Sequence, residues 1–248
     1  MDLGSHLEEH HADQSAKYIK NIIFGGIDGI ITTFSIIAAC FGSGLEIKYI
    51  IAMGAANLVA DAFSMGFGDY ISSLFENKYI ISERDKEAWE FDHNNEYETN
   101  EMIELYENEG LEKEDSKKIV EILTSNPKYK DFFIKSMVNM ELGLELPDEN
   151  YKKEIKKEGM ITFLSFIVFG FIPLFTYLVA NWFKFEKYNH IFIFDCFVTL
   201  ITIMLLGYFQ AVITKQPKLI GCLSLTLNGL ISTSIAFILG YGLERVIT

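Results

Sequence analysis

Four polar or sulfur-bearing side chains recur at every fourth position of a long apolar stretch, residues 48–75. They are Asn57, Asp61, Met65 and Asp69. On a helix this spacing places them in one slowly turning stripe. Carboxylates and thioethers bind metal ions, and carboxylates inside a membrane are costly and usually functional. The stripe predicts a metal or ion path through a helix bundle; the alternative is a packed helix that tolerates a few polar groups.

A second pattern, which we name the small-residue ladder, runs beside the stripe at the same spacing. Its members are Ala52, Ala56, Ala60, Ser64 and Gly68. Small residues let two membrane helices approach closely. We therefore expect the ladder to hold this stretch against the first membrane helix, which carries Asp28.

Asp28 lies inside another apolar stretch, residues 18–43, between Gly26 and Gly29. Gly25 and Gly29 form a GxxxG motif, which permits close contact with a neighbouring helix or with a second copy of the chain. Burial disfavours the ionised carboxylate and a bound cation favours it, so protons and metal ions compete for such a group. That competition is the elementary step of a proton/metal exchanger. A structural hydrogen bond to a neighbouring helix is the alternative.

The composition is that of a helical membrane protein with one soluble insert. Half of the 248 residues are hydrophobic, and many gather in five stretches long enough to cross a bilayer. The stretches are residues 18–43, 48–75, 159–183, 190–213 and 219–243. We expect an all-α, polytopic membrane protein with five transmembrane helices. Its divisions are an N-terminal segment (1–17), helices one and two (18–75), a helical insert (76–158) and helices three to five (159–248).

The insert, residues 76–158, is strongly acidic. It holds 23 of the 34 acidic and 13 of the 21 basic residues, and so most of the net charge of −13. Such a surface attracts cations and repels nucleic acid. Pairs of ligand-forming side chains recur in it at helical spacing: Glu87 with Glu90, Glu101 with Glu104, and Met137 with Glu141. The pairs predict a metal-binding domain; a solvated helix face is the alternative for any single pair.

The basic residues divide unequally between the two sides that five spans would define. Lys17, Lys20, the insert, Lys215 and Lys218 fall on one side. An excess of lysine and arginine marks the cytoplasmic side of a membrane protein. We therefore expect the N-terminus and the insert to lie in the cytosol.

Two polar features outside the stripe are given simpler interpretations. His6 and His10 lie four residues apart, and they are either an accessory metal contact or part of a solvated tail. Asp195 lies near one end of the fourth stretch, and we interpret it as an interfacial carboxylate within reach of Lys184 or Lys187.

Several longer motifs, taken together and in order, resemble the vacuolar iron transporter family. HLEEHH followed by IKNIIFGGIDGIITTF resembles the family's N-terminal segment and first helix. SMGFGDY resembles the signature of its second helix, and DFFIKSMVNMELGLELP the end of its metal-binding domain. FGFIPL resembles the start of its third membrane helix. The resemblance covers nearly the whole chain.

The resemblance implies a homodimer of five-helix protomers that moves Fe²⁺ from the cytosol into a storage organelle in exchange for protons. It implies a secondary transporter, a metal/proton antiporter and not an enzyme, with no prosthetic group. The membrane would be that of a vacuole, another acidic compartment or the endoplasmic reticulum. Mn²⁺ is an alternative cargo, and Zn²⁺ or Co²⁺ are alternative ions for the cytosolic domain. Soft thioethers, as in Met65 and Met137, favour transition metals over Mg²⁺ and Ca²⁺.

The resemblance also assigns residues. Asp28 and Met65 match the family's path, and its cytosolic ligands match Glu87, Glu90, Glu101, Glu104, Met137 and Glu141. There is one departure, because Asn57 stands where the family usually has a glutamate. We hypothesise that Asp61, one turn later, replaces that carboxylate.

Two other classes of function stay open. Glu90-x-x-His93 is the step found in ferritin-like di-iron sites. It would make the insert a membrane-anchored ferroxidase, although such a site normally needs two of these steps. A metal-sensing membrane scaffold is the other class, and it predicts no transport.

Overall fold

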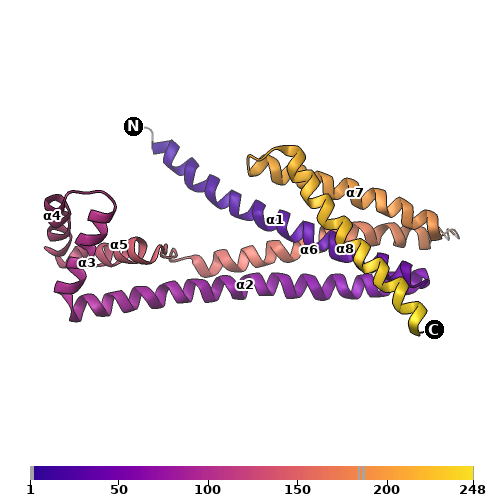
Figure 1. Ribbon diagram of the computed structural model, residues 1–248, viewed down its shortest axis with the longest axis horizontal. Helices are drawn as coiled ribbons and strands as arrows, with labels where there is room; N and C mark the ends of the chain where they lie inside the picture. The colour runs from indigo at the N-terminus through magenta and orange to yellow at the C-terminus, as the bar shows by residue number, and fades with distance from the viewer. Residues whose placement is uncertain (1–2, 184, 186–187, 248) are drawn as a thin grey trace. The chain divides into compact units, whose positions relative to one another are not determined.

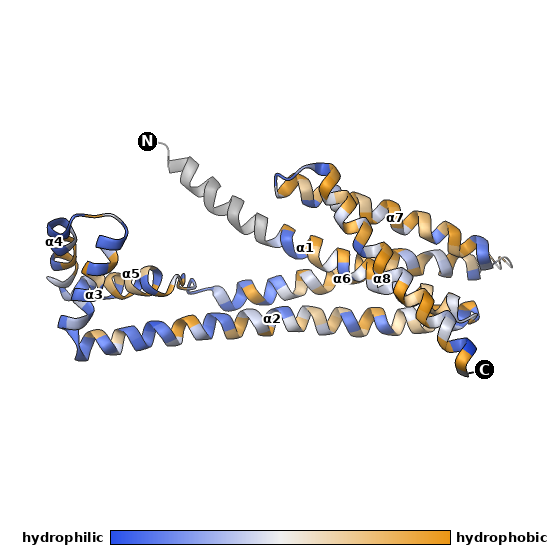
Figure 2. Ribbon diagram, in the orientation of Figure 1, coloured by the Kyte–Doolittle hydropathy of each residue, from blue (hydrophilic) through white to orange (hydrophobic). Residues whose placement is uncertain are grey.

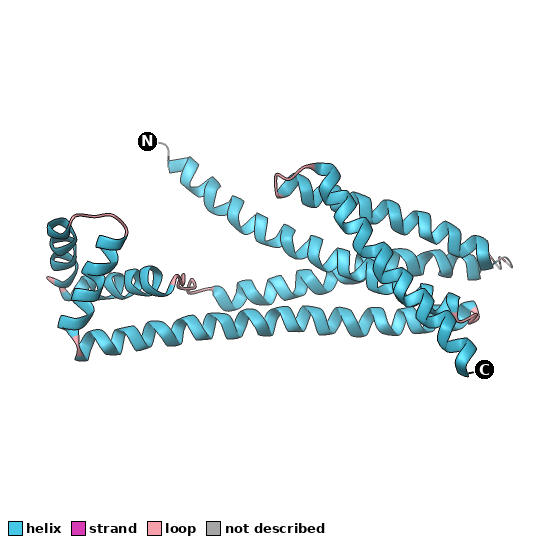
Figure 3. Ribbon diagram, in the orientation of Figure 1, coloured by secondary structure: helices cyan, strands magenta, loops and turns pink. Residues whose placement is uncertain are grey.

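The computed structural model describes the backbone of residues 3–183, 185 and 188–247, and the side chains of residues 18–183, 185 and 188–246. The described residues form helices joined by short connections, with no strand among them (Figure 3). The helices are α1 (Leu3–Gly42), α2 (Ile47–His93), α3 (Asn95–Asn108), α4 (Lys113–Thr124), η1 (Pro127–Tyr129), α5 (Lys130–Leu142), α6 (Tyr151–Trp182), α7 (Tyr188–Ile213) and α8 (Lys218–Ile247). The all-α prediction is confirmed.

Within the described ranges, five helices are long and apolar enough to cross a membrane, as predicted: α1 from Tyr18 on, α2, α6, α7 and α8. Figure 2 shows α7 and α8 mostly in the hydrophobic colour, whereas α3 and α4 are mostly hydrophilic. Helix α2 is continuous over 47 residues. No proline or glycine interrupts it between Ser72 and Glu90, so nothing in that sequence favours a break.

The chain divides into two compact units, Met1–Tyr70 with Lys156–Thr248, and Ile71–Ile155. In the first unit, α1, α2, α6 and α7 meet in a hydrophobic cluster that includes Cys40, Ile50, Tyr177 and Ile191. Helix α8 packs against α1 and α7 (Figure 1). Apolar contacts at this cluster therefore hold α1, α2, α6 and α7 together.

Helix α6 approaches α1 and α2 at their glycines. A Cβ atom added to Gly25 would lie 2.6 Å from the carbonyl oxygen of Thr162, and one added to Gly66 would lie 2.6 Å from Cβ of Phe163. Real Cβ atoms do not come so close to other atoms, so these positions require glycine. The GxxxG motif of α1 therefore contacts α6 of the same chain, and not a second copy.

The small-residue ladder does not make this contact. The buried face of α2 consists of Gly54, Leu58, Ala62 and Gly66, whereas the ladder positions are exposed. A Cβ atom added to Gly68 would meet nothing within 4 Å. The prediction that the ladder holds α2 against the first helix is wrong, because two glycines and an alanine on the adjoining face allow a closer approach to α6.

We expect Gly66→Val to destabilise the first unit by about 1–3 kcal/mol, because the new side chain overpacks the contact with α6. Gly242→Val is the control, since it makes the same change on another membrane-crossing helix, α8, at a position where an added Cβ atom meets nothing within 4 Å. Thermal unfolding in detergent measures both variants. Equal melting temperatures for the two variants would contradict the packing described here.

The second unit has a small core of its own. Met102 of α3, Val120 of α4, and Phe133 and Met137 of α5 form a buried cluster. Gly143, with φ of 64°, follows the last residue of α5. Glycine adopts this left-handed conformation without a steric cost, which makes it a common helix stop. These contacts hold α3, α4 and α5 together, and Phe91 of α2 packs against the same cluster.

Candidate metal path and carboxylate cluster

Asp28 of α1 and Asp61 of α2 lie near one another inside the first unit. Both side chains are half-buried, and they are close enough for their charges to repel. The side-chain amide of Asn57 donates a hydrogen bond to the carboxylate of Asp61. A divalent cation held between two such neighbouring carboxylates would relieve their repulsion. The structure thus brings together three of the residues that the sequence proposed for the path.

Met65 lies one turn beyond Asp61 and is partly buried. It packs against a cluster that contains Leu58, Ala62 and Phe166. These are the contacts of a core side chain, and Met65 also follows Asp61 by one turn of α2 on the stripe. Met65 is therefore a core side chain that would line the path and offer its thioether sulfur as a soft ligand.

Asp69, the last residue of the stripe, connects three helices. Its carboxylate accepts a hydrogen bond of 2.7 Å from the hydroxyl of Thr162 on α6 and one of 3.3 Å from the side-chain amide of Asn21 on α1. Its charge is thus partly satisfied within the protein, and a role in fixing α1, α2 and α6 accounts for it. An ion at this position would have to share the carboxylate with both donors.

Five glutamates of the second unit act on one another electrostatically. They come from α2, α3 and α5, and they are Glu87, Glu90, Glu98, Glu101 and Glu141. We name them the carboxylate cluster. Four of them were singled out in the sequence, but Glu98 was not. Glu104 is exposed and is not part of this group.

Burial sets the proton affinity of the carboxylate cluster. It raises the pKa of Glu87 from 4.5 to about 7, with the charge of Glu141 adding to the effect. Burial and then the charge of Glu101 raise the pKa of Glu98 to about 6. Glu87 is only 2% exposed, and one of its carboxyl oxygens is buried without a hydrogen-bond partner. Such a group binds either a proton or a cation near neutral pH.

Met137 lies beside the cluster but in the core. Its side chain is 1% exposed and packs with Met102 and Phe133. Among the described residues, no three histidine, cysteine, aspartate or glutamate side chains converge closely enough to hold a metal ion as they stand. Mutual repulsion of carboxylates favours a spread arrangement, so ion binding would require these side chains to draw together.

Glu98 is the member of the carboxylate cluster that was not predicted from the sequence. It precedes Glu101 by three residues, which places the two on one helix face. Glu104 continues the same spacing, but six residues turn a helix through about 600°, so Glu104 points well away from Glu98. The i,i+3 spacing was therefore a usable signal for Glu98, and burial decides which two of the three glutamates face the cluster.

Asp195 differs from its predicted setting. Its side chain is completely buried, and neither carboxyl oxygen has a hydrogen-bond partner. The interpretation as an interfacial carboxylate is wrong, because residues of α6 and α7 enclose the group. Lys184 and Lys187, the suggested partners, and the side chains of His6 and His10 lie outside the described residues.

We expect the second unit to lose stability as the pH rises from 5 to 8. Glu87 and Glu98 have a higher pKa in the folded chain than their ordinary value of 4.5, so the folded state binds more protons than the unfolded state in this range. The expected loss is about 1–3 kcal/mol after allowance for solvent screening. Denaturant unfolding of a Trp182→Phe background, in which Trp89 is the remaining tryptophan, measures it. Glu87→Gln should flatten the pH dependence; an unchanged slope would contradict the assignment.

The five helices of the described chain that are long and apolar enough to cross a membrane define the class, a multi-pass membrane protein. The chain belongs to the VIT family, whose sequence profile matches residues 19–241. It is 40% identical to the vacuolar iron transporter of Plasmodium berghei over 241 residues, which cover 96% of this chain and 86% of that protein. It is 38% identical to that of Plasmodium falciparum, covering 100% and 89%. Identity to vacuolar iron transporter 1 of Oryza sativa subsp. japonica is 25%, covering 98% and 92%.

Proposed function

We propose that this chain transports Fe²⁺ from the cytosol into a vacuole-like compartment, in exchange for protons. The observation that carries the proposal is the approach of Asp28 and Asp61 from two membrane helices, with Asn57 bound to Asp61. Two carboxylates balance the charge of one divalent cation. Their repulsion makes the pair unfavourable without a cation, so release of the metal has to be coupled to proton uptake by the protein, which is the requirement for exchange.

The carboxylate cluster of the second unit captures the metal in this proposal. Its glutamates supply several oxygen ligands, and Met137 supplies a sulfur if its side chain turns out of the core. Oxygen ligands suit Fe²⁺ and Mn²⁺, and a thioether disfavours Mg²⁺ and Ca²⁺. Fe²⁺ is the proposed cargo and Mn²⁺ the alternative. Binding of Zn²⁺ or Co²⁺ would be confined to the cluster.

The proposed assembly is a homodimer. The small-residue ladder is exposed along α2, and it lies next to the stripe that carries Asp61. Small side chains on a lipid-facing surface allow close approach of a second membrane helix. A contact through the ladder would enclose the half-buried carboxylate pair between two copies of the chain. The proposed orientation has the N-terminus and the carboxylate cluster in the cytosol, as the distribution of lysines indicates.

Ion flux into proteoliposomes tests the proposal. Purified chain is reconstituted in vesicles with an acidic interior, and uptake of Fe²⁺, Mn²⁺ and Ca²⁺ is followed with and without the pH gradient. We expect Fe²⁺ uptake that rises with the gradient and little uptake of Ca²⁺. Absence of gradient-driven Fe²⁺ uptake would overturn the exchanger, and equal uptake of Ca²⁺ would overturn the selectivity for transition metals.

A further inference from the structure

The structure contains a second intramembrane carboxyl group that the metal path does not use. Asp195 of α7 is 0% exposed, and both of its carboxyl oxygens lack a hydrogen-bond partner. It lies in the first turns of α7, whereas the path residues belong to α1 and α2. No lysine, arginine or histidine among the described residues acts on it.

The neighbours of Asp195 are hydroxyl and thiol groups. Tyr177 of α6 is close enough to interact with it electrostatically, and the hydroxyl of Tyr177 is itself buried without a partner. Thr199, one turn along α7, has a buried and unpartnered hydroxyl as well. Thr176 of α6 also approaches the carboxyl, although outside hydrogen-bond geometry. The other titratable groups here are the thiols of Cys40 and Cys196, which face Tyr177.

These surroundings fix the charge that the group can carry. An ionised carboxylate without a counter-ion costs several kcal/mol in a low-dielectric interior. Asp195 must therefore bind one proton or one monovalent cation. A single carboxylate among neutral hydroxyls matches a monovalent ion. A divalent transition metal is better matched by the two carboxylates and the sulfur of Asp28, Asp61 and Met65. Of the two cations in the proposed exchange, Asp195 therefore suits the proton.

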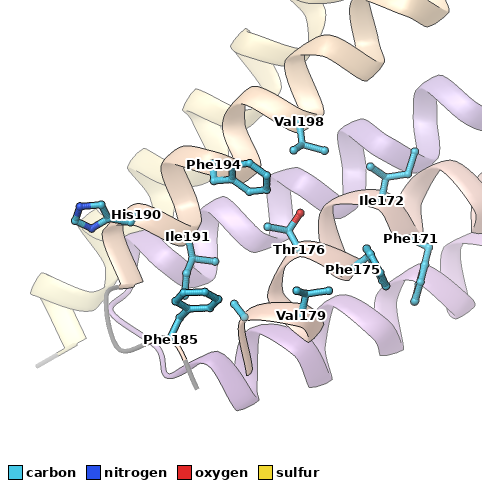
Figure 4. A pocket seen from close by; sticks show the side chains of 11 residues that line it. Phe171, Ile172, Phe175, Thr176, Val179, Phe185, His190, Ile191, Phe194 and Val198 are labelled. Atoms are coloured by element: carbon cyan, nitrogen blue, oxygen red, sulfur yellow. The ribbon is translucent and has the colours of Figure 1, made fainter. Parts of the chain in front are cut away.

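Two grooves are lined by residues that neighbour Asp195, and both are mainly apolar. Figure 4 shows the first, of about 1060 Å³, between α6 and α7, where Phe171, Phe175 and Phe194 surround the hydroxyl of Thr176 and His190 lies at one end. This apolar lining does not favour water. The second groove, of about 460 Å³, is lined mainly by apolar side chains such as Phe34, Phe192 and Leu230. It also holds the hydroxyl groups of Thr199 of α7 and of Thr226, Thr233 and Ser234 of α8.

The second groove offers a route for protons. A water molecule occupies about 30 Å³ in the liquid and needs two to four polar partners, which the groove volume and its hydroxyl groups supply. Thr199 belongs both to this lining and to the surroundings of Asp195. Thr199 thus links the surroundings of Asp195 to the hydroxyl groups of this groove.

We propose that Asp195 is the proton-carrying residue of the exchange, separate from the metal path; this role rests on the proposed function. A proton from the acidic compartment forms the O–H bond of the Asp195 carboxyl, and the same bond breaks when the proton leaves toward the cytosol. Tyr177 belongs to the hydrophobic cluster that also contains Ile50 of α2 and Cys40 of α1. Through this cluster, the charge on Asp195 acts on the packing of the helices that carry Asp28 and Asp61.

Asp195→Asn tests the proposal, because asparagine keeps the size of the side chain and its neutral state. The full chain is reconstituted in vesicles that contain a pH-sensitive dye, and Fe²⁺ uptake and proton efflux are followed together. We expect Fe²⁺-dependent proton efflux to fall by about tenfold or more and Fe²⁺ uptake to lose its response to the gradient. Thr202→Val, on the same helix, is the matched control and should behave as wild type. Asp195→Glu keeps a titratable group and should retain the efflux.

The outcomes separate the two proposals. If wild-type chain takes up Fe²⁺ without moving protons, the exchange and the role of Asp195 both fall. If wild type exchanges protons and Asp195→Asn does so equally well, only the role of Asp195 falls. If both Asp195→Asn and Asp195→Glu lose all Fe²⁺ uptake, Asp195 serves packing and the proton-carrying role is overturned.

Discussion

Fe²⁺ uptake into proteoliposomes is expected to fall by about tenfold or more when Asp28 is replaced by alanine. The substitution leaves Asp61 as the one carboxylate of the pair, and a single negative charge cannot balance a divalent cation in apolar surroundings. Asp28 is half-buried and has no ion pair in the described chain. Its removal also relieves a repulsion with Asp61, so the fold should persist. Initial uptake rates at matched protein content measure the effect.

Asn228→Ala is the control for this variant. Asn228 is also a polar residue inside a membrane-crossing helix, but it is exposed on α8, away from the carboxylate pair. We expect wild-type uptake from it. Uptake by Asp28→Ala at the wild-type rate would show that the metal does not pass between α1 and α2, and the path would have to be sought elsewhere in the first unit.

The second large effect concerns the exchange of positions between Asn57 and Asp61. Asp61→Asn alone should lower Fe²⁺ uptake as strongly as the loss of Asp28, because it removes the other half of the pair. Adding Asn57→Glu returns one carboxylate to α2, one turn away. The hydrogen bond between the two positions can then re-form with the amide and carboxylate exchanged. We expect the double variant to recover a substantial fraction of uptake.

Recovery would show that α2 needs one carboxylate in this region and that two depths are acceptable. The variant Asn57→Glu alone is the useful comparison, since it holds three carboxylates in the path and should bind protons more tightly. A double variant as inactive as Asp61→Asn would mean that Asp61 acts at its own position and does not replace the family's glutamate.

The membrane helices were predictable because length and hydropathy are local properties. Each of the five apolar stretches lies within a helix. Helices α7 and α8 keep close to the predicted bounds, whereas α1 begins earlier, at Leu3, α2 runs on to His93 and α6 begins at Tyr151. The family was predictable for a related reason, since motifs such as SMGFGDY and the IDGI step at Asp28 are short, ordered and specific. The prediction of the membrane helices and that of the family required no knowledge of tertiary contacts.

The packing faces were not predictable from spacing alone. The ladder through Ala56 and Ala60 and the buried face through Leu58 and Ala62 have the same helical period. The difference is decided by α6, which presents Gly159 to Gly66 and Leu174 to Gly54 at close range. A single-helix pattern carries no information about that partner. The GxxxG motif of α1 was ambiguous for the same reason.

The ionisable residues show the same limit. Glu98 and Glu104 are equally spaced from Glu101, and burial beside α2 and α5 singles out Glu98. We predicted that Asp195 is an interfacial residue because it lies near the end of an apolar stretch. Its enclosure by Tyr177 and Thr199 depends on how α6 meets α7, which no spacing within α7 reports.

In the proposed orientation, in which the carboxylate cluster faces the cytosol, the burial of Glu87 and Glu98 has a consequence for the cytosol. With a pKa of about 7 and about 6, these carboxyl groups hold protons in part at neutral pH. A metal ion that takes the oxygens must displace those protons, so each capture would acidify its surroundings slightly. Conversely, an acid load in the cytosol would occupy the cluster and slow the supply of metal. The insert would then couple metal sequestration to cytosolic acid–base balance before any ion enters the membrane.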